Sequence, residues 1–296
     1  MKTAGVIGIG DMGSGLAKNL MAAGLTVRGF DLQDHRMAAF SKAGGVACAT
    51  PAEVGQGAEA VCVMVMNGDQ AKEVILGDQG LVQTMDKGSV ILLTATIKPK
   101  EAREIGDSLE GSGLLLIDSP VSGGRPGADG GTLTLMASGS DAAFAKAAPA
   151  IDAISATLHR VGEDIGVGQT VKACLQSLIG SIFGGAFEAS VLAAKAGVPG
   201  QVIYDVFSTS AAGCGITNAA IGNVMNRAFE DTGSSIHTMH KDITISLDLA
   251  MDLGVPLFTA STAMQLFQAG RTKHPDKDNQ AVALISEEIV GVGLKK

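Results

Sequence analysis

The sequence predicts an α/β domain with a mostly parallel sheet, followed by an all-helical domain. Short apolar, β-like runs alternate with helical patterns through the first part of the chain, as expected of parallel strands joined by helices. Strand signals stop after Gly162, and only helical patterns follow. A third observation is a closely spaced set of glycines between the first β-like run and the first helical pattern.

The predicted strands lie in the first part of the chain. The apolar runs cover residues 4–9, 25–30, 60–66, 90–93, 114–117 and 133–137, and a last short strand is predicted at 157–161. Helical patterns separate most of these runs, so helices would cover both faces of the sheet. Because 296 residues exceed the usual size of one domain, we expect two domains, residues 1–162 and 163–296.

The second domain begins with one long helical pattern at residues 168–196. Further helical patterns cover residues 200–209, 219–226, 236–253, 259–269 and 279–290. Small residues recur along the long pattern: Gly180, Gly184, Gly185, Ala186, Ala189, Ala193 and Ala194. They allow another helix to approach closely, either within the chain or across a subunit interface. Because helices with few large side chains bury little core alone, we expect a homo-oligomer, a dimer or a tetramer.

Composition and charge exclude several classes of partner. The net charge of −8 argues against nucleic acid and against anionic membranes. No apolar run is expected to be long enough to cross a bilayer. The scattered cysteines form no C-x-x-C pair and no signal peptide is apparent, so we expect a cytoplasmic protein. His237 and His240 lack a neighbouring ligand cluster, so no metal site is expected.

The glycines near the start have the spacing of a dinucleotide-binding loop. Gly8, Gly10 and Gly13 follow the pattern G-x-G-x-x-G between a predicted strand and a predicted helix. Asp31 ends the next predicted strand, eighteen residues after Gly13. In a chain with 40 glycines they would also fit ordinary turns. The strand, the helix and the acid in their expected places instead favour a Rossmann domain.

This loop and Asp31 predict the cofactor. The loop that would hold the pyrophosphate, at the N–H groups of a helix N-terminus, comprises Gly8, Ile9, Gly10, Asp11, Met12 and Gly13. Asp31 would accept hydrogen bonds from the adenosine ribose and repel a 2′-phosphate. Of the nearby cations that would offset this repulsion, we consider Arg28, which lies inside the strand, and His35. The sequence therefore predicts NAD rather than NADP.

A second glycine-rich segment, from Asp118 to Thr134, follows the predicted strand at residues 114–117. In open α/β sheets, ligands bind at the carboxyl ends of the strands. Ser122, Gly123 and Gly124 would offer a hydroxyl and backbone N–H groups to a carboxylate. By its spacing alone, the segment fits equally well a glycine-rich connection between two strands.

A lysine near the start of the long helical pattern is the third candidate. Lys172 and Gln176 lie one turn apart and would share a helix face. Ile179 and Phe183 continue this face, which is mostly apolar. A lysine on such a face usually extends its ammonium group into solvent. The pattern alone therefore favours a surface lysine over a catalytic one.

Taken together, the motifs resemble the β-hydroxyacid dehydrogenase family over essentially the whole chain. The first pattern, G-x-G-x-M-G-x-x-x-A-x-N-L, begins at Gly8 and ends at Leu20. The family's substrate motif, D-x-P-V-S-G-G-x-x-G-A-x-x-G-x-L-T, matches from Asp118 to Thr134. Its G-x-G-x-x-x-K pattern and its late Lys-Asp pair match Gly166, Gly168, Lys172, Lys241 and Asp242.

The resemblance implies roles for these residues. Lys172 would be the general acid/base, and Ser122, Gly123 and Gly124 would bind the substrate carboxylate. Gln176 would add an amide to the substrate site.

Three further residues would lie by the cofactor, according to the same resemblance. Thr96 and Lys241 would lie near the nicotinamide, and Asn67 near the ribose.

Departures from the family pattern point to one of its branches. Leu175 and Gln176 stand where two asparagines are common, and Asn67 and Gln70 lie in a loop that often reads Leu-Pro. Lys98 occupies a position where serine is common. The first two departures resemble the L-threonate dehydrogenase branch.

We therefore expect NAD-dependent oxidation of a short, polyhydroxylated acid such as L-threonate. One alternative is a semialdehyde reductase of the tartronate semialdehyde, sulfolactaldehyde or 3-hydroxyisobutyrate type. Another is a non-catalytic NAD-binding protein.

Overall fold

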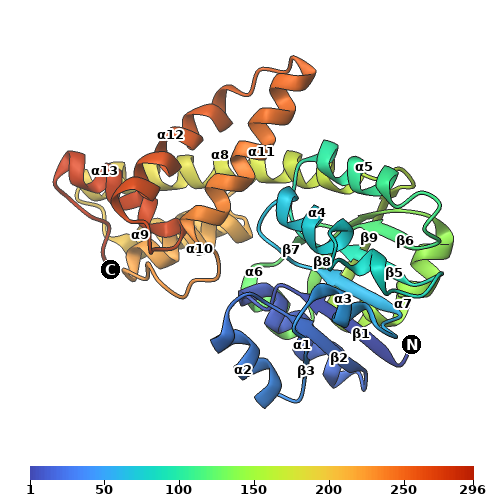
Figure 1. The fold of residues 1–296 in the computed structure, drawn as a ribbon. Coiled ribbons are helices and arrows are strands. Elements are labelled where there is room, and N and C mark those ends of the chain that lie inside the picture. Colours follow the sequence, from blue (N-terminus) through green and yellow to red (C-terminus); the bar gives the residue numbers. More distant parts are fainter. The chain divides into compact units, whose positions relative to one another are not determined.

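The computed structural model describes residues 1–296, and its contacts separate two compact units, Met1–Lys172 and Ala173–Lys296 (Figure 1). The sheet lies in the first unit, and the second unit is built from helices. This confirms the predicted fold class. The predicted domain boundary after Gly162 stays a prediction.

One sheet of nine strands forms the centre of the first unit. Its strands are β1 (Thr3–Ile7), β2 (Thr26–Phe30), β3 (Val46–Ala47), β4 (Ala60–Val63), β5 (Val90–Leu93), β6 (Leu115–Asp118), β7 (Val121–Ser122), β8 (Leu133–Ser138) and β9 (Ser155–Gly162). The order is β3-β2-β1-β4-β5-β6-β8-β7, with β9 beside β8. Strands β1 to β6 pair in parallel, whereas β8 pairs antiparallel with β6 and β7 and parallel with β9. The order 3-2-1-4-5-6 is that of a Rossmann fold.

Helices cover both faces of this sheet (Figure 1). They are α1 (Asp11–Ala22), α2 (Asp34–Lys42), α3 (Pro51–Gly55), α4 (Gly68–Leu76), the 3-10 helix η1 (Leu81–Gln83), α5 (Pro99–Ser108), α6 (Gly124–Gly130) and α7 (Asp141–Ile154). Successive residues of β4 enter opposite cores: Cys62 packs with residues of α1 and α7, and Val61 with residues of α3, α4 and α5. Burial on both faces explains why the central strands are continuous apolar runs.

The second unit packs its helices around an aromatic cluster. It contains the rest of α8 (Val167–Lys195), with α9 (Gly200–Thr209), α10 (Gly215–Met225), α11 (Ile236–Leu253), α12 (Phe258–Lys273), the 3-10 helix η2 (Asn279–Val282) and α13 (Ala283–Val290). The Phe183 ring lies 5.5 Å from that of Phe187 and 6.0 Å from that of Phe267. A Cβ at Gly180 would lie 2.7 Å from the Ile243 side chain. At this position the small residue therefore serves packing within the chain.

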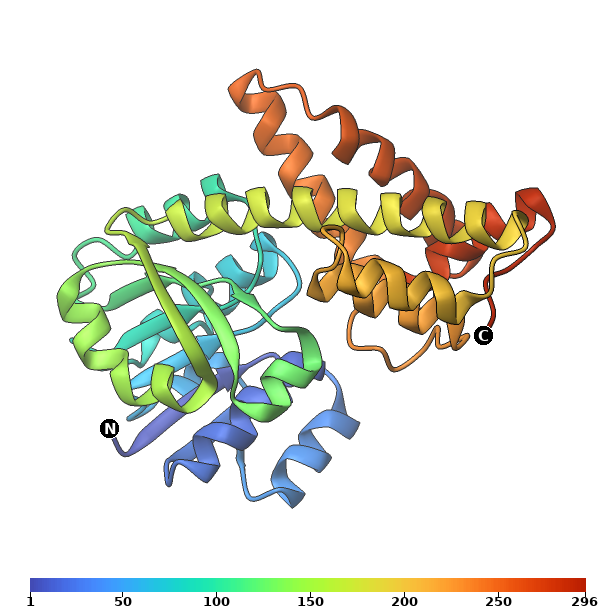
Figure 2. The same cartoon turned by 180° about the vertical axis from the view of Figure 1, so that it is seen from behind.

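Helix α8 is a single unbroken helix of 29 residues (Figure 2). By length and composition alone it could cross a membrane, so the expectation that no apolar run is long enough was wrong. The core helix of a soluble protein meets the same criterion, and one such helix is weak evidence for insertion. Phe183, Ala186 and Phe187 of α8 are buried in the core of the helical unit.

We predict opposite effects of alanine at two glycines. A Cβ at Gly13 would lie 1.7 Å from the carbonyl oxygen of Gly8, whereas one at Gly185 meets nothing within 4 Å. Gly13→Ala should therefore lower the free energy of unfolding by about 1–3 kcal/mol or more, because α1 must move away from β1. Gly185→Ala should raise it by up to about 1 kcal/mol. Urea denaturation measures both, and a Gly13→Ala variant as stable as the parent would contradict the packing argument.

Candidate active site

The glycine loop between β1 and α1 has the shape that a dinucleotide requires. Gly8 has φ +87°, and a Cβ there would lie 2.4 Å from the Met64 carbonyl oxygen. Gly10 is the N-cap of α1, and no side chain caps this helix. The N–H groups of the first turn are therefore available to phosphate oxygens, and the absence of side chains leaves room for them. The predicted loop residues thus fit a pyrophosphate.

Asp31 is tied to this loop. Its Oδ2 accepts a hydrogen bond of 2.8 Å from the Ile9 N–H, and its Oδ1 accepts one of 2.9 Å from the Gln33 N–H. The cation beside it is Arg36, whose Nη1 lies 3.3 Å from Oδ2. Because α2 begins at Asp34, its first turn brings Arg36 back to the end of β2.

The sequence analysis considered Arg28 and His35 as the cations near Asp31 and did not include Arg36. Arg28 donates its Nε–H to the Glu53 carbonyl oxygen instead. Arg36 was missed because the start of α2, two residues before it, is hard to locate from sequence.

Two further loops follow β4 and β5. Asn67 is exposed and caps α4 by accepting a hydrogen bond of 2.9 Å from the Gln70 N–H. Thr96 is half-buried between Ala95 and Ile97, which are both buried. Both predicted cofactor residues thus lie beyond the carboxyl ends of parallel strands, on the edge of the sheet where ligands bind in such folds.

The predicted carboxylate-binding residues end β7 and lead into α6. Ser122 pairs with Thr134 of β8, and Gly123 and Gly124 have φ values of +130° and +58°. A short helix, rather than an irregular connection, leads on toward β8. The Asn19 amide of α1 donates a hydrogen bond of 2.7 Å to the Ala128 carbonyl oxygen of α6. The glycine loop and the Ser122 segment are therefore linked through packed helices.

Asp118, at the end of β6, is fully buried against the start of α8. Its Oδ2 accepts hydrogen bonds from the Gly166 N–H (2.9 Å) and the Gln169 N–H (3.1 Å), and its Oδ1 accepts one of 2.8 Å from the Gln169 side-chain amide. Burial raises the pKa of Asp118 to about 6, although these donors act to lower it. The sequence showed Asp118 only as the first residue of a motif and gave no sign of Gln169.

Lys172 lies one turn beyond Gln169 on α8 and is 6% exposed. It is not the solvated surface lysine that the apolar face favoured. The preceding glycines explain its position: Gly166 has φ +97°, and a Cβ at Gly168 would lie 2.6 Å from the Met136 carbonyl oxygen. The spacing G-x-G-x-x-x-K thus lets the helix start directly against the strand ends.

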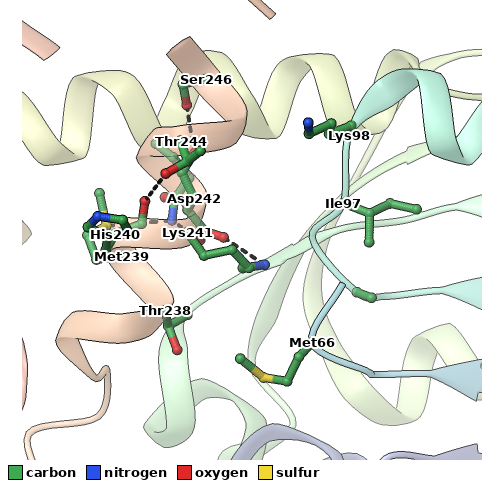
Figure 3. Close-up of polar contacts among 12 residues, drawn as sticks. Met66, Ile97, Lys98, Thr238, Met239, His240, Lys241, Asp242, Thr244 and Ser246 are labelled. Atoms are coloured by element: carbon green, nitrogen blue, oxygen red, sulfur yellow. Dashed lines mark hydrogen bonds and ion pairs between the residues drawn. The ribbon is translucent and has the colours of Figure 1, made fainter. Parts of the chain in front are cut away.

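In the helical unit, Gln176 and Lys241 meet at one carboxylate, that of Asp242. The Gln176 amide donates to Asp242 Oδ2 at 2.5 Å. Lys241 Nζ forms an ion pair with Asp242 Oδ1 at 3.0 Å (Figure 3). Asp242 is 3% exposed, and Ser246 donates to its backbone carbonyl oxygen. Sequence reasoning noted Asp242 only as half of a Lys-Asp pair.

The predicted site residues coincide neither with a cluster of metal-ligating side chains nor with the hollow of the helical unit. No group of three or more His, Cys, Asp or Glu side chains is placed to hold a metal ion. A hollow of about 430 Å³ lies in the helical unit beside Tyr204 and Asn218, and none of the predicted site residues lines it.

Comparison with known proteins shows the family of this chain. Residues 3–162 match the family model "NAD binding domain of 6-phosphogluconate dehydrogenase". Residues 166–285 match the family model "NAD-binding of NADP-dependent 3-hydroxyisobutyrate dehydrogenase". L-threonate dehydrogenase from Escherichia coli is 35% identical over 98% of this chain and 97% of its own length. The chain belongs to the β-hydroxyacid dehydrogenase family.

Other β-hydroxyacid dehydrogenases share the fold throughout. The structure of 3-hydroxyisobutyrate dehydrogenase from Salmonella typhimurium superposes with a TM-score of 0.87 at 33% identity, covering 96% of this chain and 100% of that one. A 3-hydroxyisobutyrate dehydrogenase from Pseudomonas aeruginosa is 31% identical over 88% of this chain and 89% of its own length. The resemblance seen in the motifs is confirmed. This β-hydroxyacid dehydrogenase is a nicotinamide-dependent enzyme that acts on a hydroxy acid.

The buried carboxylate predicts a pH dependence of stability. The pKa of Asp118 is about 6 in the folded protein and starts from 3.8, so the folded state binds its proton more tightly than the unfolded state does. The stability that this proton contributes is full below pH 3.8 and is lost as the pH rises through 6. Relative to Asp118→Asn, the parent should lose about 2 kcal/mol of unfolding free energy between pH 4.5 and 7.5. Urea denaturation at both pH values measures the difference, and a pH-independent difference would show that the carboxyl group titrates normally.

Proposed function

We propose that this enzyme oxidises a short polyhydroxylated acid, such as L-threonate, with NAD⁺. The observation that carries the proposal is the buried lysine at the start of α8, in the same compact unit as a loop that fits a dinucleotide. The names of the relatives support the substrate class, since several L-threonate dehydrogenases match 94–98% of the chain at 32–35% identity.

Lys172 acts as the general base in this proposal. A lysine must be neutral to accept the hydroxyl proton. Bound NAD⁺ supplies the hydride acceptor at C4 of the nicotinamide. Lys172 removes the proton from the hydroxyl oxygen as the adjacent carbon is oxidised, and it returns a proton in the reverse direction.

The substrate carboxylate is placed by Ser122, Gly123 and Gly124. The hydroxyl of Ser122 and the two glycine N–H groups are donors that suit an anion, and positive φ values turn the glycine backbone in ways that L side chains rarely adopt. Gln176 directs its amide nitrogen to Asp242, so the group it offers to a substrate hydroxyl is its amide oxygen.

The remaining predicted residues serve the cofactor. Asp31 accepts hydrogen bonds from the adenosine ribose, which favours NAD over NADP. Asn67 lies near the ribose, and Thr96 and Lys241 lie near the nicotinamide. The enzyme is proposed to be cytoplasmic and to form a homodimer or homotetramer.

A semialdehyde reductase is the second candidate. It uses the same groups in the reverse direction, with Lys172 as the acid. The 3-hydroxyisobutyrate dehydrogenases among the relatives support this candidate, because oxidation of the primary alcohol in their named substrate gives a semialdehyde.

The reaction is tested with a panel of C3–C4 hydroxy acids and semialdehydes. We expect the highest kcat/KM with L-threonate and NAD⁺. Lys172→Ala should lower kcat by about 10²–10⁴-fold, the usual contribution of a general acid/base, with the Kd for NAD⁺ unchanged. Lys195→Ala, at the exposed end of the same helix, is the matched control and should keep full activity. A Lys172→Ala enzyme with near-parental kcat would exclude the proposed mechanism.

Cofactor preference is tested at Asp31 and Arg36. The parent should bind NAD⁺ more tightly than NADP⁺ in a fluorescence titration. Asp31→Asn removes the repelling charge and frees Arg36, so the Kd for NADP⁺ should fall at least about tenfold, or ~1.4 kcal/mol. Adding Arg36→Ala should abolish most of that gain. A parent enzyme that prefers NADP⁺ would show that Asp31 does not select against the 2′-phosphate.

A further inference from the structure

We propose that Asp118 and Gln169 are positioning residues that fasten the loop after β5 to the first turn of α8. This hydrogen-bonded pair, the Asp118–Gln169 lock, fixes Lys172 relative to Thr96. The inference rests on the proposed function, in which Lys172 transfers the proton and Thr96 lies beside the nicotinamide. All of these residues belong to the first compact unit.

Gln169 is fully buried, and both the oxygen and the nitrogen of its side-chain amide form hydrogen bonds. Its Oε1 accepts a hydrogen bond of 3.0 Å from the Ile97 N–H. Its Nε2 donates to the Ala95 carbonyl oxygen at 2.9 Å and to Asp118 Oδ1 at 2.8 Å. Because one partner is a backbone N–H and another is a backbone carbonyl, the amide has only one orientation that satisfies both.

Asp118 holds the other side of the lock. Its Oδ2 accepts from the N–H groups of Gly166 and Gln169, at the end of α8 where N–H groups have no partners within the helix. A carboxylate at a helix N-terminus is also favoured by the helix dipole. One buried side chain thus joins the sheet, the helix start and the Gln169 amide.

The lock leaves little freedom to the groups that it joins. Thr96 stands between Ala95 and Ile97, the two residues whose backbone Gln169 binds. Lys172 follows Gln169 by one helical turn, so any slide or rotation of that turn moves its ammonium group. A Cβ at Gly168 would lie 2.7 Å from the Asp118 carbonyl oxygen, so the turn is already as close to β6 as backbone allows. A misplacement of about 1 Å costs up to ~10²-fold in rate.

A reciprocal pair of substitutions tests the lock. Gln169→Glu places a second carboxylate against Asp118, and Asp118→Asn places an amide donor against the Gln169 Nε2 donor. Each should lower kcat by about 10- to 100-fold, while the Kd for NAD⁺ changes less than about threefold. Combining the two lets the new amide donate to the new carboxylate, so kcat should recover by about tenfold over Gln169→Glu. Recovery stays partial because the Ala95 carbonyl oxygen has lost its donor.

Hydrogen exchange provides a readout that does not depend on turnover. Exchange of the Ile97, Gly166 and Gln169 amides should accelerate in each single variant and slow again in the double variant. If Asp118→Asn does not fold, Ser138→Ala offers a milder change, since it removes only the long contacts to Asp118 and to the Gly168 N–H. It should give a smaller loss of kcat in the same direction.

The outcomes separate the lock from the proposed function. Faster exchange with unchanged kcat, or a double variant no better than the worse single one, would reduce the pair to a structural role and overturn the inference. Lys172→Ala is measured in parallel. If it keeps its kcat, the proposed function fails; if it loses kcat while the lock variants keep theirs, only the positioning role fails.

Discussion

The buried carboxylate of Asp118 is the interaction on which the geometry of the first unit's candidate site depends. Removing a carboxylate from water is costly, and it is tolerated where hydrogen bonds replace the lost hydration. The first N–H groups of α8 require hydrogen-bond acceptors, because the helix itself provides them with none. Asp118 and the helix start satisfy each other, and Lys172 stands on the second turn of that helix.

Glycines position the elements around the candidate site as much as the polar groups do. Where α1 meets β1 and α6, a Cβ at Gly13 or Gly15 would collide with backbone atoms, at 1.7 Å and 2.6 Å. Where α8 meets the strand ends, Gly168 plays the same part. Backbone in contact with backbone leaves no flexible side chain to absorb a shift. These close backbone contacts therefore position the loops around the proposed cofactor and substrate sites.

Charges near the proposed site are arranged locally, against a net charge of −8. Arg36 is paired with Asp31, and Lys241 with Asp242. Both pairs join a cation to a carboxylate that is itself held by further hydrogen bonds, from the Ile9 N–H in one case and from Gln176 in the other. Each carboxylate therefore already has a cation as its partner in this structure.

The fold class, the glycine loop with Asp31, and the family could all be predicted from the sequence. These follow from local patterns: apolar periodicity reports which faces are buried, and the glycine spacing reports a turn that few other residues can form. Short strands such as β3 and β7 were not predicted, because a strand of two residues shows no periodicity.

The pairing of residues that are distant in sequence became visible in the folded chain. The structure showed Arg36 at Asp31, Gln176 at Asp242, and Gln169 between Asp118 and the backbone around Thr96. In the structure Lys172 is buried, whereas the apolar helix face on which it lies had favoured a surface lysine. The physical reason is that hydrogen bonding and burial depend on what lies opposite a side chain, and a neighbour 51 residues away, as Asp118 is from Gln169, leaves no periodic trace in the sequence.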